Sequence, residues 1–247
     1  MEHLPEQSPL RDYPATYRPS TEGVVRFIDT HYQGFNLANV LHRLDALSKE
    51  RMFEWTSVVA EVAPSGNLII SHEYDDLDTD DRPLLLKVIL KLPVDGCRVV
   101  THEEMFLPIR FQRRGLSAEL LKPYYEQYRN ARVDSIRILA SDTGGGYVWA
   151  KYGFRAIYKK ELNDILERPE TLTVTSRVIS NLRLTITDFY NTRPDTVAFP
   201  IRAWTPFTFS KELLMGTTWH GVLDLNDAEH RAFFEDYLYS RPQPLPS

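Results

Sequence analysis

The sequence predicts a mixed α+β fold, in which a central twisted mixed sheet is flanked by helices and followed by a C-terminal extension. Between residues 84 and 154, segments with a hydrophobic period of two alternate with segments of period 3.6, which is typical of a sheet covered by helices. Hydrophobic residues make up 43% of the 247 residues and charged residues 26%, so the chain can bury a sizeable core. We expect an N-terminal arm over 1–20, a core domain over 21–165, an extension over 166–240 and a tail over 241–247. The arm is assigned from its four prolines and weak periodicity.

The first half of the expected core contains one helix and two strand pairs. Apolar residues recur at helical spacing over residues 36–51, and Asn36 is the expected N-cap. Residues 54–74 predict a hairpin around Pro-Ser-Gly, and residues 83–109 predict a second strand pair around Pro-Val-Asp-Gly. The acidic stretch 75–82 lacks the glycine and the distal glutamate of an EF-hand loop, which favours a solvated loop over a calcium site.

The second half continues the alternation of strands and helices. A turn precedes a helix that begins near Ser117, a strand follows over 134–141, and a glycine-led short helix follows over 143–154. Residues 155–170 pass from strand to helix and are stopped by Pro169. Residues 171–190 are ambiguous between strand and helix, because β-branched side chains compete with helical spacing. A last helix is expected from Asp227, which would cap it.

Composition excludes several function classes. The net charge is -5, from 34 acidic and 29 basic residues, so the chain lacks the overall basic field of a nucleic-acid-binding protein. Cys97 is the only cysteine, which excludes a disulfide framework and a cysteine-rich zinc site and favours a reducing, cytoplasmic setting. We expect Cys97 to be a core residue. No apolar run approaches the ~20 residues that cross a bilayer, and we expect no secretory signal.

The histidines do not form a metal-binding pattern. None of them pairs with another at the spacing of metal ligands, so structural or surface roles are favoured. The histidines considered are His31, His42, His72, His102, His220 and His230.

Two arginines stand before a glycine where the strand ending near Ile109 gives way to a helix. A turn with consecutive unpaired backbone N–H groups at the start of a helix binds anions, because the donors and the helix dipole both favour negative charge. Gly115 permits close approach, Ser117 is small, and Arg113 and Arg114 add positive charge. The alternative interpretation is an ordinary turn with two solvated arginines.

Residues 112–117 (Gln-Arg-Arg-Gly-Leu-Ser) resemble the acetyl-CoA-binding signature of the GNAT N-acetyltransferase superfamily. That signature has Gln or Arg, two residues, Gly, one residue, and then Gly or Ala, between a central strand and a helix. Residues 144–154 (GGGYVWAKYGF) resemble the second conserved block of the family, a short helix that ends in Gly-Phe. The segment 134–141 falls where the family has its fifth strand. The resemblance covers residues 84–160 best.

The resemblance implies that acetyl-CoA lies with its pyrophosphate on the main chain around Gly115 and its pantetheine along the fourth strand. Gln112 would shape the turn. The residues that this assigns to the cofactor are Leu107, Ile109, Gln112, Arg113, Arg114, Gly115, Leu116, Ser117 and Trp149. An amine would attack the thioester directly, without an acyl-enzyme.

The resemblance also implies a base and an acid, because the attacking amine loses a proton and the leaving thiolate gains one. Glu103 falls where several family members carry a catalytic glutamate, and its neighbour Glu104 is expected on the opposite face of the strand. The family often places a tyrosine acid where this chain has Trp149, so Tyr147 or Tyr152 would replace it, or solvent would supply the proton.

A second departure from the family pattern is Pro108. In the expected register it lies in the fourth strand, whose backbone pairs with pantetheine, and proline has no N–H to donate. The leading interpretation is therefore an acyltransferase that moves an acetyl group from acetyl-CoA to a primary amine. The alternative is a GNAT-fold protein that binds or assembles without turnover, and a third is an effector that modifies a macromolecule. The acceptor is undetermined, nucleic acid is disfavoured, no membrane partner is expected, and a homodimer is left open.

Overall fold

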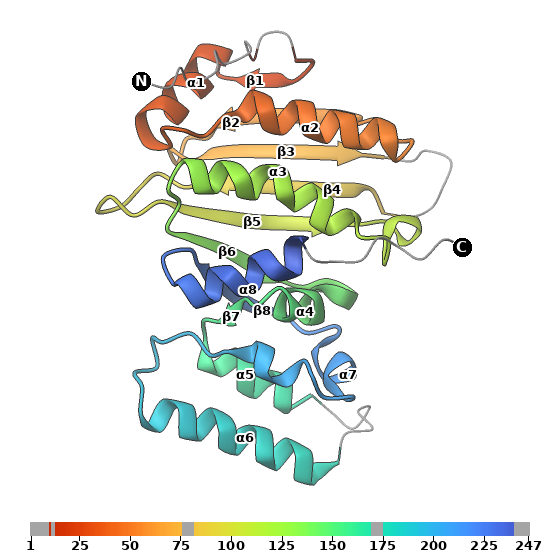
Figure 1. Cartoon of the computed structure of the whole chain (residues 1–247), viewed down its shortest axis with the longest axis vertical. Coiled ribbons are helices and arrows are strands. Elements are labelled where there is room, and N and C mark those ends of the chain that lie inside the picture. The colour runs from red at the N-terminus through yellow and green to blue at the C-terminus, as the bar shows by residue number, and fades with distance from the viewer. Residues whose placement is uncertain (1–9, 11–12, 76–81, 169–174, 240–247) are drawn as a thin grey trace. The chain divides into compact units, whose positions relative to one another are not determined.

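The computed structural model describes residues 10, 13–75, 82–168 and 175–239 (Figure 1). The chain forms two compact units, one within residues 1–134 together with Leu238 and Tyr239, and the other over residues 135–237. Both contain strands and helices, so the mixed α/β fold class predicted from the sequence is confirmed. The domain boundary expected at residue 165 stays a prediction.

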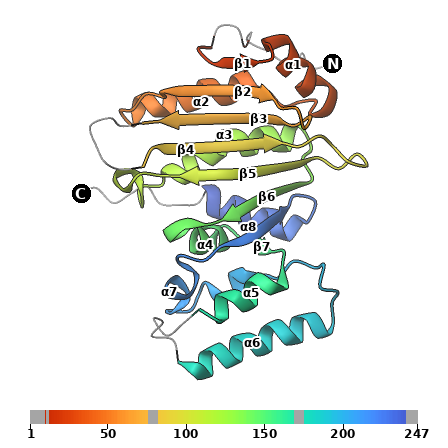
Figure 2. The ribbon, with the colours of Figure 1, turned by 180° about the vertical axis from the view of Figure 1, so that it is seen from behind.

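The sheet of the first unit has the strand order β1-β2-β3-β4-β5. β1 runs parallel to β2, and the remaining neighbours are antiparallel. Helices α2 and α3 cover one face of this sheet, and the strands stand in front of them when seen from behind (Figures 1 and 2). The elements of this unit are β1 (Thr16–Arg18), α1 (Thr21–His31), α2 (Leu37–Glu50), β2 (Ser57–Val62), β3 (Leu68–Tyr74), β4 (Leu84–Leu90), β5 (Val99–Phe106), the 3-10 helix η2 (Ile109–Phe111) and α3 (Leu116–Asn130).

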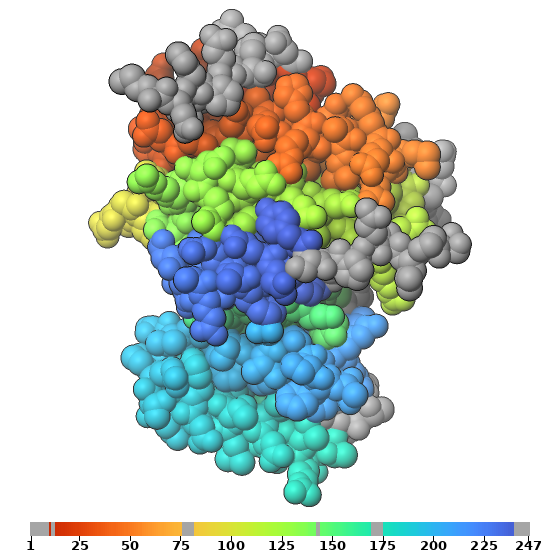
Figure 3. Space-filling view, viewed as in Figure 1, coloured from red at the N-terminus to blue at the C-terminus, as the bar shows by residue number. Residues whose placement is uncertain are grey.

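Helices α2 and α3 lie side by side, as their adjoining surfaces show (Figure 3). The predicted helix over 36–51 is confirmed, and the Asn36 side chain caps it by accepting a hydrogen bond from the Asn39 N–H at 2.9 Å. Arg51 forms a bidentate ion pair with Glu119 of α3, with its closest contact at 2.6 Å. Arg43 joins the same two helices through Glu126.

Two buried histidines connect the sheet to α3. The His72 Nε2 lies 2.9 Å from the Tyr124 hydroxyl, and the His102 Nε2 lies 2.9 Å from the Tyr128 hydroxyl. Burial lowers the pKa of each histidine to about 3, because the charged imidazolium would lose its hydration. Both side chains therefore serve as neutral core residues, in agreement with the structural role expected for them.

The second unit has the strand order β6-β8-β7, all antiparallel. β8 lies between the other two strands, so residues well beyond 165 complete this sheet. The elements are β6 (Ser135–Ala140), α4 (Asp142–Lys151), β7 (Arg155–Ala156), α5 (Lys159–Leu166), α6 (Ser176–Asn191), the 3-10 helix η3 (Ile201–Trp204), α7 (Ser210–Leu214), β8 (Trp219–Asp224) and α8 (Ala228–Tyr239).

The ambiguous segment 171–190 forms helix α6 over its described part. Leu182, Ile186 and Tyr190 are buried at intervals of four residues, so the 3.6-residue period outweighs the β-branched residues. Asp227 caps α8 as predicted, since its carboxylate accepts from the His230 N–H at 3.0 Å. Pro169, residues 76–81 of the acidic loop and the tail 241–247 lie outside the described residues.

Two predictions from the sequence are wrong. Cys97 is exposed rather than buried, because β5 starts only at Val99 and Cys97 belongs to the turn before it. Pro108 is not a strand residue, because β5 ends at Phe106 and Pro108 precedes η2. The missing N–H of Pro108 therefore leaves the pairing of β5 intact.

The buried histidines predict a loss of stability in acid. Their pKa is about 3 in the folded state and about 6.5 when unfolded, so the unfolded chain binds more protons as the pH falls from 6.5 toward 3. Each histidine should lower the free energy of unfolding by about 1.4 kcal/mol per pH unit inside that window. Urea denaturation at a series of pH values measures the slope.

His72→Leu should reduce that slope by about 1.4 kcal/mol per pH unit. His42→Gln is the matched control, because the His42 ring is exposed. An unchanged slope in His72→Leu would contradict the assignment.

Candidate functional site

The loop between β5 and α3 forms an open turn at the start of a helix. After η2 the backbone takes a left-handed conformation twice, at Arg113 (φ 61°) and at Gly115 (φ 79°, ψ -4°). Gly115 is the N-cap of α3, and its carbonyl accepts hydrogen bonds from Ala118 and Glu119 at 3.0 and 3.3 Å. A glycine suits this position, because a left-handed conformation is costly for other residues.

The amide groups of this turn are available to a ligand. Within the described part of the chain, no protein acceptor forms a hydrogen bond with the backbone N–H of Arg113, Arg114, Gly115 or Leu116. A Cβ built on Gly115 would meet no atom within 4 Å, so no side chain fills the space above the turn. Unpaired consecutive amides in an open turn bind oxyanions. We call the backbone of residues 113–116 the nest.

The charges around the nest are positive. Arg113 and Arg114 are exposed, and neither forms an ion pair with any described residue. Glu119 lies in the first turn of α3, where it would repel an anion, but both of its oxygens bind Arg51. The macrodipole of α3 adds a partial positive charge at the same end of the helix.

Neighbouring side chains hold the loop in place. The Gln112 Nε2 donates to the Leu107 carbonyl at 2.8 Å, which closes the turn before the nest. The Arg110 guanidinium lies over the rings of Tyr74 and Phe111 at 5.2 and 4.7 Å from their centres. Phe111 also packs against Phe53, with the ring centres 5.3 Å apart.

The other residues that the resemblance assigns to the cofactor differ in exposure. Leu116 is buried, so only its amide is available to a ligand. Ile109 is 76% exposed, whereas Leu107 and Ser117 are half-buried. Gln112, Arg113, Arg114 and Gly115 therefore lie in the loop, and Leu116 is the first residue of α3.

Glu103 lies in the same unit, at an irregularity of β5. Lys87 of β4 pairs with Glu104, while the next residue of β4 pairs with His102, which leaves Glu103 as the extra residue of a β-bulge. The Glu103 carboxylate lies 2.6 Å from the Lys87 Nζ, and both side chains are partly exposed. The hydrogen bond between Lys87 and Glu103 raises the pKa of Lys87. The Glu103 carboxylate is thus already paired with a cation of the neighbouring strand.

The predicted proton donors belong to the second unit. Tyr152 caps α4 and is fully buried, where its ring packs against Trp149, Phe234 and Tyr237. Trp149 is also buried. Tyr147 is half-buried, and the Lys151 ammonium lies 5.3 Å from the centre of its ring. Of the two tyrosines, only Tyr147 reaches the surface.

Sequence reasoning missed Lys87 and Arg51, the two cations that neutralise Glu103 and Glu119. Alternation over residues 84–90 places Lys87 on the face opposite the buried leucines, and this was a usable signal. Its partner depends on the register of β4 and β5, which one sequence does not reveal.

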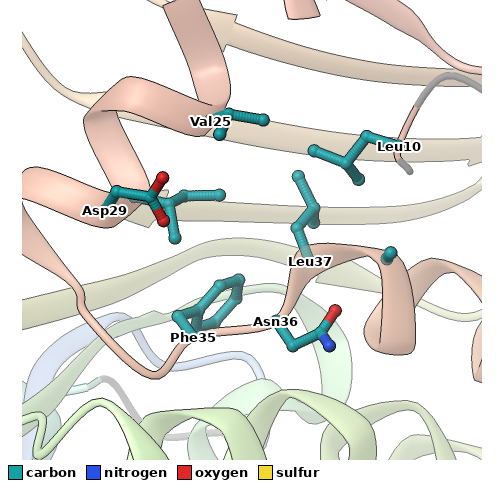
Figure 4. A pocket seen from close by; sticks show the side chains of 8 residues that line it. Leu10, Val25, Asp29, Phe35, Asn36 and Leu37 are labelled. Carbon is teal, nitrogen blue, oxygen red and sulfur yellow. The ribbon is translucent and has the colours of Figure 1, made fainter. Parts of the chain in front are cut away.

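Two further features do not form a chemical site. A small recess between α1 and α2 is lined mainly by apolar side chains, among them Leu10, Phe35 and Leu37, together with Asp29 and Asn36 (Figure 4). The Asn36 side chain is already used as a helix cap. Among the described residues, no three His, Cys, Asp or Glu side chains are grouped so that they could hold a metal ion. The helices in the described ranges are all too short or too polar to span a bilayer.

Comparisons with known proteins give a partial likeness to a solved structure. No family model matches the chain, and no curated protein does. Among solved structures, the chain is similar to a GNAT family acetyltransferase from Elizabethkingia anophelis with acetyl-CoA bound. The match covers 64% of this chain and 76% of that chain, with 15% sequence identity and a TM-score of 0.29.

The ion pair at the bulge predicts slow chemical labelling of Lys87. The pKa of Lys87 is raised, so its amine should stay protonated at pH values at which other lysines begin to react with acetic anhydride. Glu103→Gln should speed the labelling by about two- to fivefold, in line with the strength of a surface ion pair.

Site-resolved mass spectrometry measures both rates. Lys160 is the control, since its own partner is Asp164, which the substitution does not touch. Equal labelling of Lys87 in wild type and variant would show that the ion pair does not form in solution.

Proposed function

We propose that this protein binds acetyl-CoA at the nest and transfers the acetyl group to a primary amine. The observation that carries the proposal is the set of four unpaired amides at residues 113–116. Two of these residues, Arg113 and Arg114, have side chains without ion-pair partners in the described chain. A diphosphate matches this arrangement, because it presents several oxyanions to adjacent backbone donors and to guanidinium groups. The resemblance of residues 112–117 to the GNAT signature supports the same ligand.

In this proposal Glu103 accepts the proton that the attacking amine loses. The amine nitrogen forms a bond to the thioester carbon, the C–S bond breaks, and the thiol product takes up a proton. Glu103 is partly exposed and bound to Lys87, so an incoming ammonium competes with Lys87 for the same carboxylate. Of the two tyrosines expected from the sequence as proton donors, Tyr152 is enclosed in the core of the second unit and Tyr147 is half-buried.

A second candidate function is binding without turnover. Two observations favour it: Trp149 replaces the tyrosine of the family pattern, and Glu103 is already paired with a lysine. Such a protein would bind the cofactor at the nest and would release no CoA thiol with any amine. A cytoplasmic location stays a prediction, the acceptor is undetermined, and a homodimer is left open.

Gly115→Glu should abolish cofactor binding at the nest. The new carboxylate would occupy the open space above Gly115 and repel the diphosphate, so we expect the affinity for CoA to fall at least about tenfold, or about 1.4 kcal/mol. Titration calorimetry with CoA measures this.

Gly96→Glu is the matched control. Gly96 also has a left-handed φ (77°) and open space around its Cβ, but it lies in the turn between β4 and β5. Both variants should lose about 1 kcal/mol of folding stability from backbone strain, and only Gly115→Glu should lose CoA. No binding by the wild type, or equal binding by both variants, would contradict the proposal.

Glu103→Gln should lower turnover while CoA binding is retained. Loss of the proton acceptor should reduce the rate by about 10²-fold or more, measured as CoA thiol release against a panel of amines. Lys87→Met, which frees the carboxylate of its ion-pair partner, should leave turnover equal or higher.

The two functions give different results in this assay. Thiol release by the wild type that is unchanged in Glu103→Gln would remove the base assignment. CoA binding by the wild type with no thiol release from any amine would select the second candidate.

A further inference from the structure

A histidine and a glutamate form a close pair at the start of β8, within the second unit. The His220 Nδ1 lies 2.6 Å from one carboxylate oxygen of Glu161, and the His220 backbone N–H donates to the other oxygen at 2.8 Å. Both oxygens of Glu161 thus hold the same residue. His220 is therefore held at two points, its backbone N–H and its imidazole ring.

The sheet explains why Glu161 is so placed. The His220 carbonyl accepts from the Ile157 N–H at 2.9 Å, just after the short strand β7 ends at Ala156. Helix α5 begins at Lys159 and packs against β7 and β8 (Figure 2). Glu161 of α5 therefore supplies the acceptor that a longer β7 would have offered to the His220 N–H. Accepting from the His220 N–H occupies one carboxylate oxygen of Glu161, and the second oxygen binds the His220 ring.

The pairing decides which ring nitrogen is free. An ionised carboxylate only accepts hydrogen bonds, so the Nδ1 of His220 carries the proton and the lone pair lies on Nε2. No hydrogen bond joins Nε2 to any of the residues that the structure describes. The His220 side chain is 46% exposed and that of Glu161 only 19%, so the ring reaches solvent while its orienting group is shielded.

Apolar surface lies beside the imidazole. The Tyr158 ring meets it edge to face, with centres 5.2 Å apart, and Tyr158 is 52% exposed. Leu139 of β6 is the cross-strand partner of His220 and is 38% exposed. A small ligand with an aromatic or aliphatic body can therefore rest against these side chains while a polar centre meets Nε2.

We propose that His220 and Glu161 form a nucleophilic pair that attacks small activated acyl esters with an apolar body. The Nε2 lone pair forms a bond to the acyl carbon, and the bond from that carbon to the ester oxygen breaks to release an alkoxide or phenolate. Glu161 stabilises the positive charge that develops on the ring by holding the Nδ1 proton. Water then hydrolyses the acyl-imidazolium, which releases the carboxylic acid, and the ring passes one proton to solvent to return to its neutral form.

The first test reads the tautomer and the reactivity of His220 in the full chain. Nitrogen-15 NMR should show the neutral ring protonated at Nδ1 and bare at Nε2. Diethyl pyrocarbonate should acylate His220 at least about fivefold faster than His42, when the plateau rates at high pH are compared by site-resolved mass spectrometry. His42 is an internal control: it is exposed and also meets a tyrosine ring edge to face, that of Tyr13, but no carboxylate holds it.

Two variants distinguish a nucleophilic role of His220 and Glu161 from a purely structural one. Glu161→Gln keeps an acceptor for the His220 backbone N–H, yet it should lower the acylation of His220 to near the rate of His42 and leave His42 unchanged. With 4-nitrophenyl acetate as the probe, His220→Gln should lose most of the nitrophenolate release that wild type shows above background. Circular dichroism confirms that each variant is folded.

Three results would each overturn the proposal. They are a neutral ring protonated at Nε2, equal acylation of His220 and His42 in the wild type, and nitrophenolate release that His220→Gln does not reduce.

Discussion

The architecture of the first unit depends on how α3 is fixed at its start and along its length. Gly115 allows the chain to turn through a left-handed conformation and enter the helix at once. Further along, Tyr124 and Tyr128 bind the two buried histidines of the sheet, while Glu119 and Glu126 bind arginines of α2. The helix is thereby held against both the sheet and α2, and its amino end stays open. An anion site of this kind needs a rigid helix whose first amides are left unused.

The charged side chains of the first unit differ in whether they have an ion-pair partner. Two acidic side chains of the unit are paired with cations, Glu119 with Arg51 and Glu103 with Lys87. Arg113 and Arg114 lie in the loop and contribute positive charge that no described acidic residue neutralises. An overall charge of -5 thus coexists with a local cationic turn, because the sign of a site depends on which charges are paired around it.

Two glycines of the second unit allow neighbouring elements to approach closely. A Cβ on Gly146 would lie 2.3 Å from the Leu214 carbonyl oxygen, so α4 approaches the end of α7 only because this residue has no side chain. Gly153 has a left-handed φ of 92°, and its carbonyl accepts a hydrogen bond from His230 Nε2 at 2.7 Å. The Gly-Phe motif is therefore a packing element that ties α4 to α8. This accounts for the burial of Trp149 and Tyr152 beside it.

The sequence by itself determined the local elements and the candidate turn. Periodicity predicted α2, the hairpin of β2 and β3, and the turn that joins β5 to α3. These features depend on the order of apolar and polar residues and on a few turn and cap residues. The tertiary structure decided what depends on pairing between distant segments. The bulge that pairs Glu103 with Lys87, the insertion of β8 between β6 and β7, the exposure of Cys97 and the contact of Glu161 with His220 all depend on strand register or on helix docking. Register and docking are set by the free energy of the whole folded core, and no local pattern in one sequence encodes them.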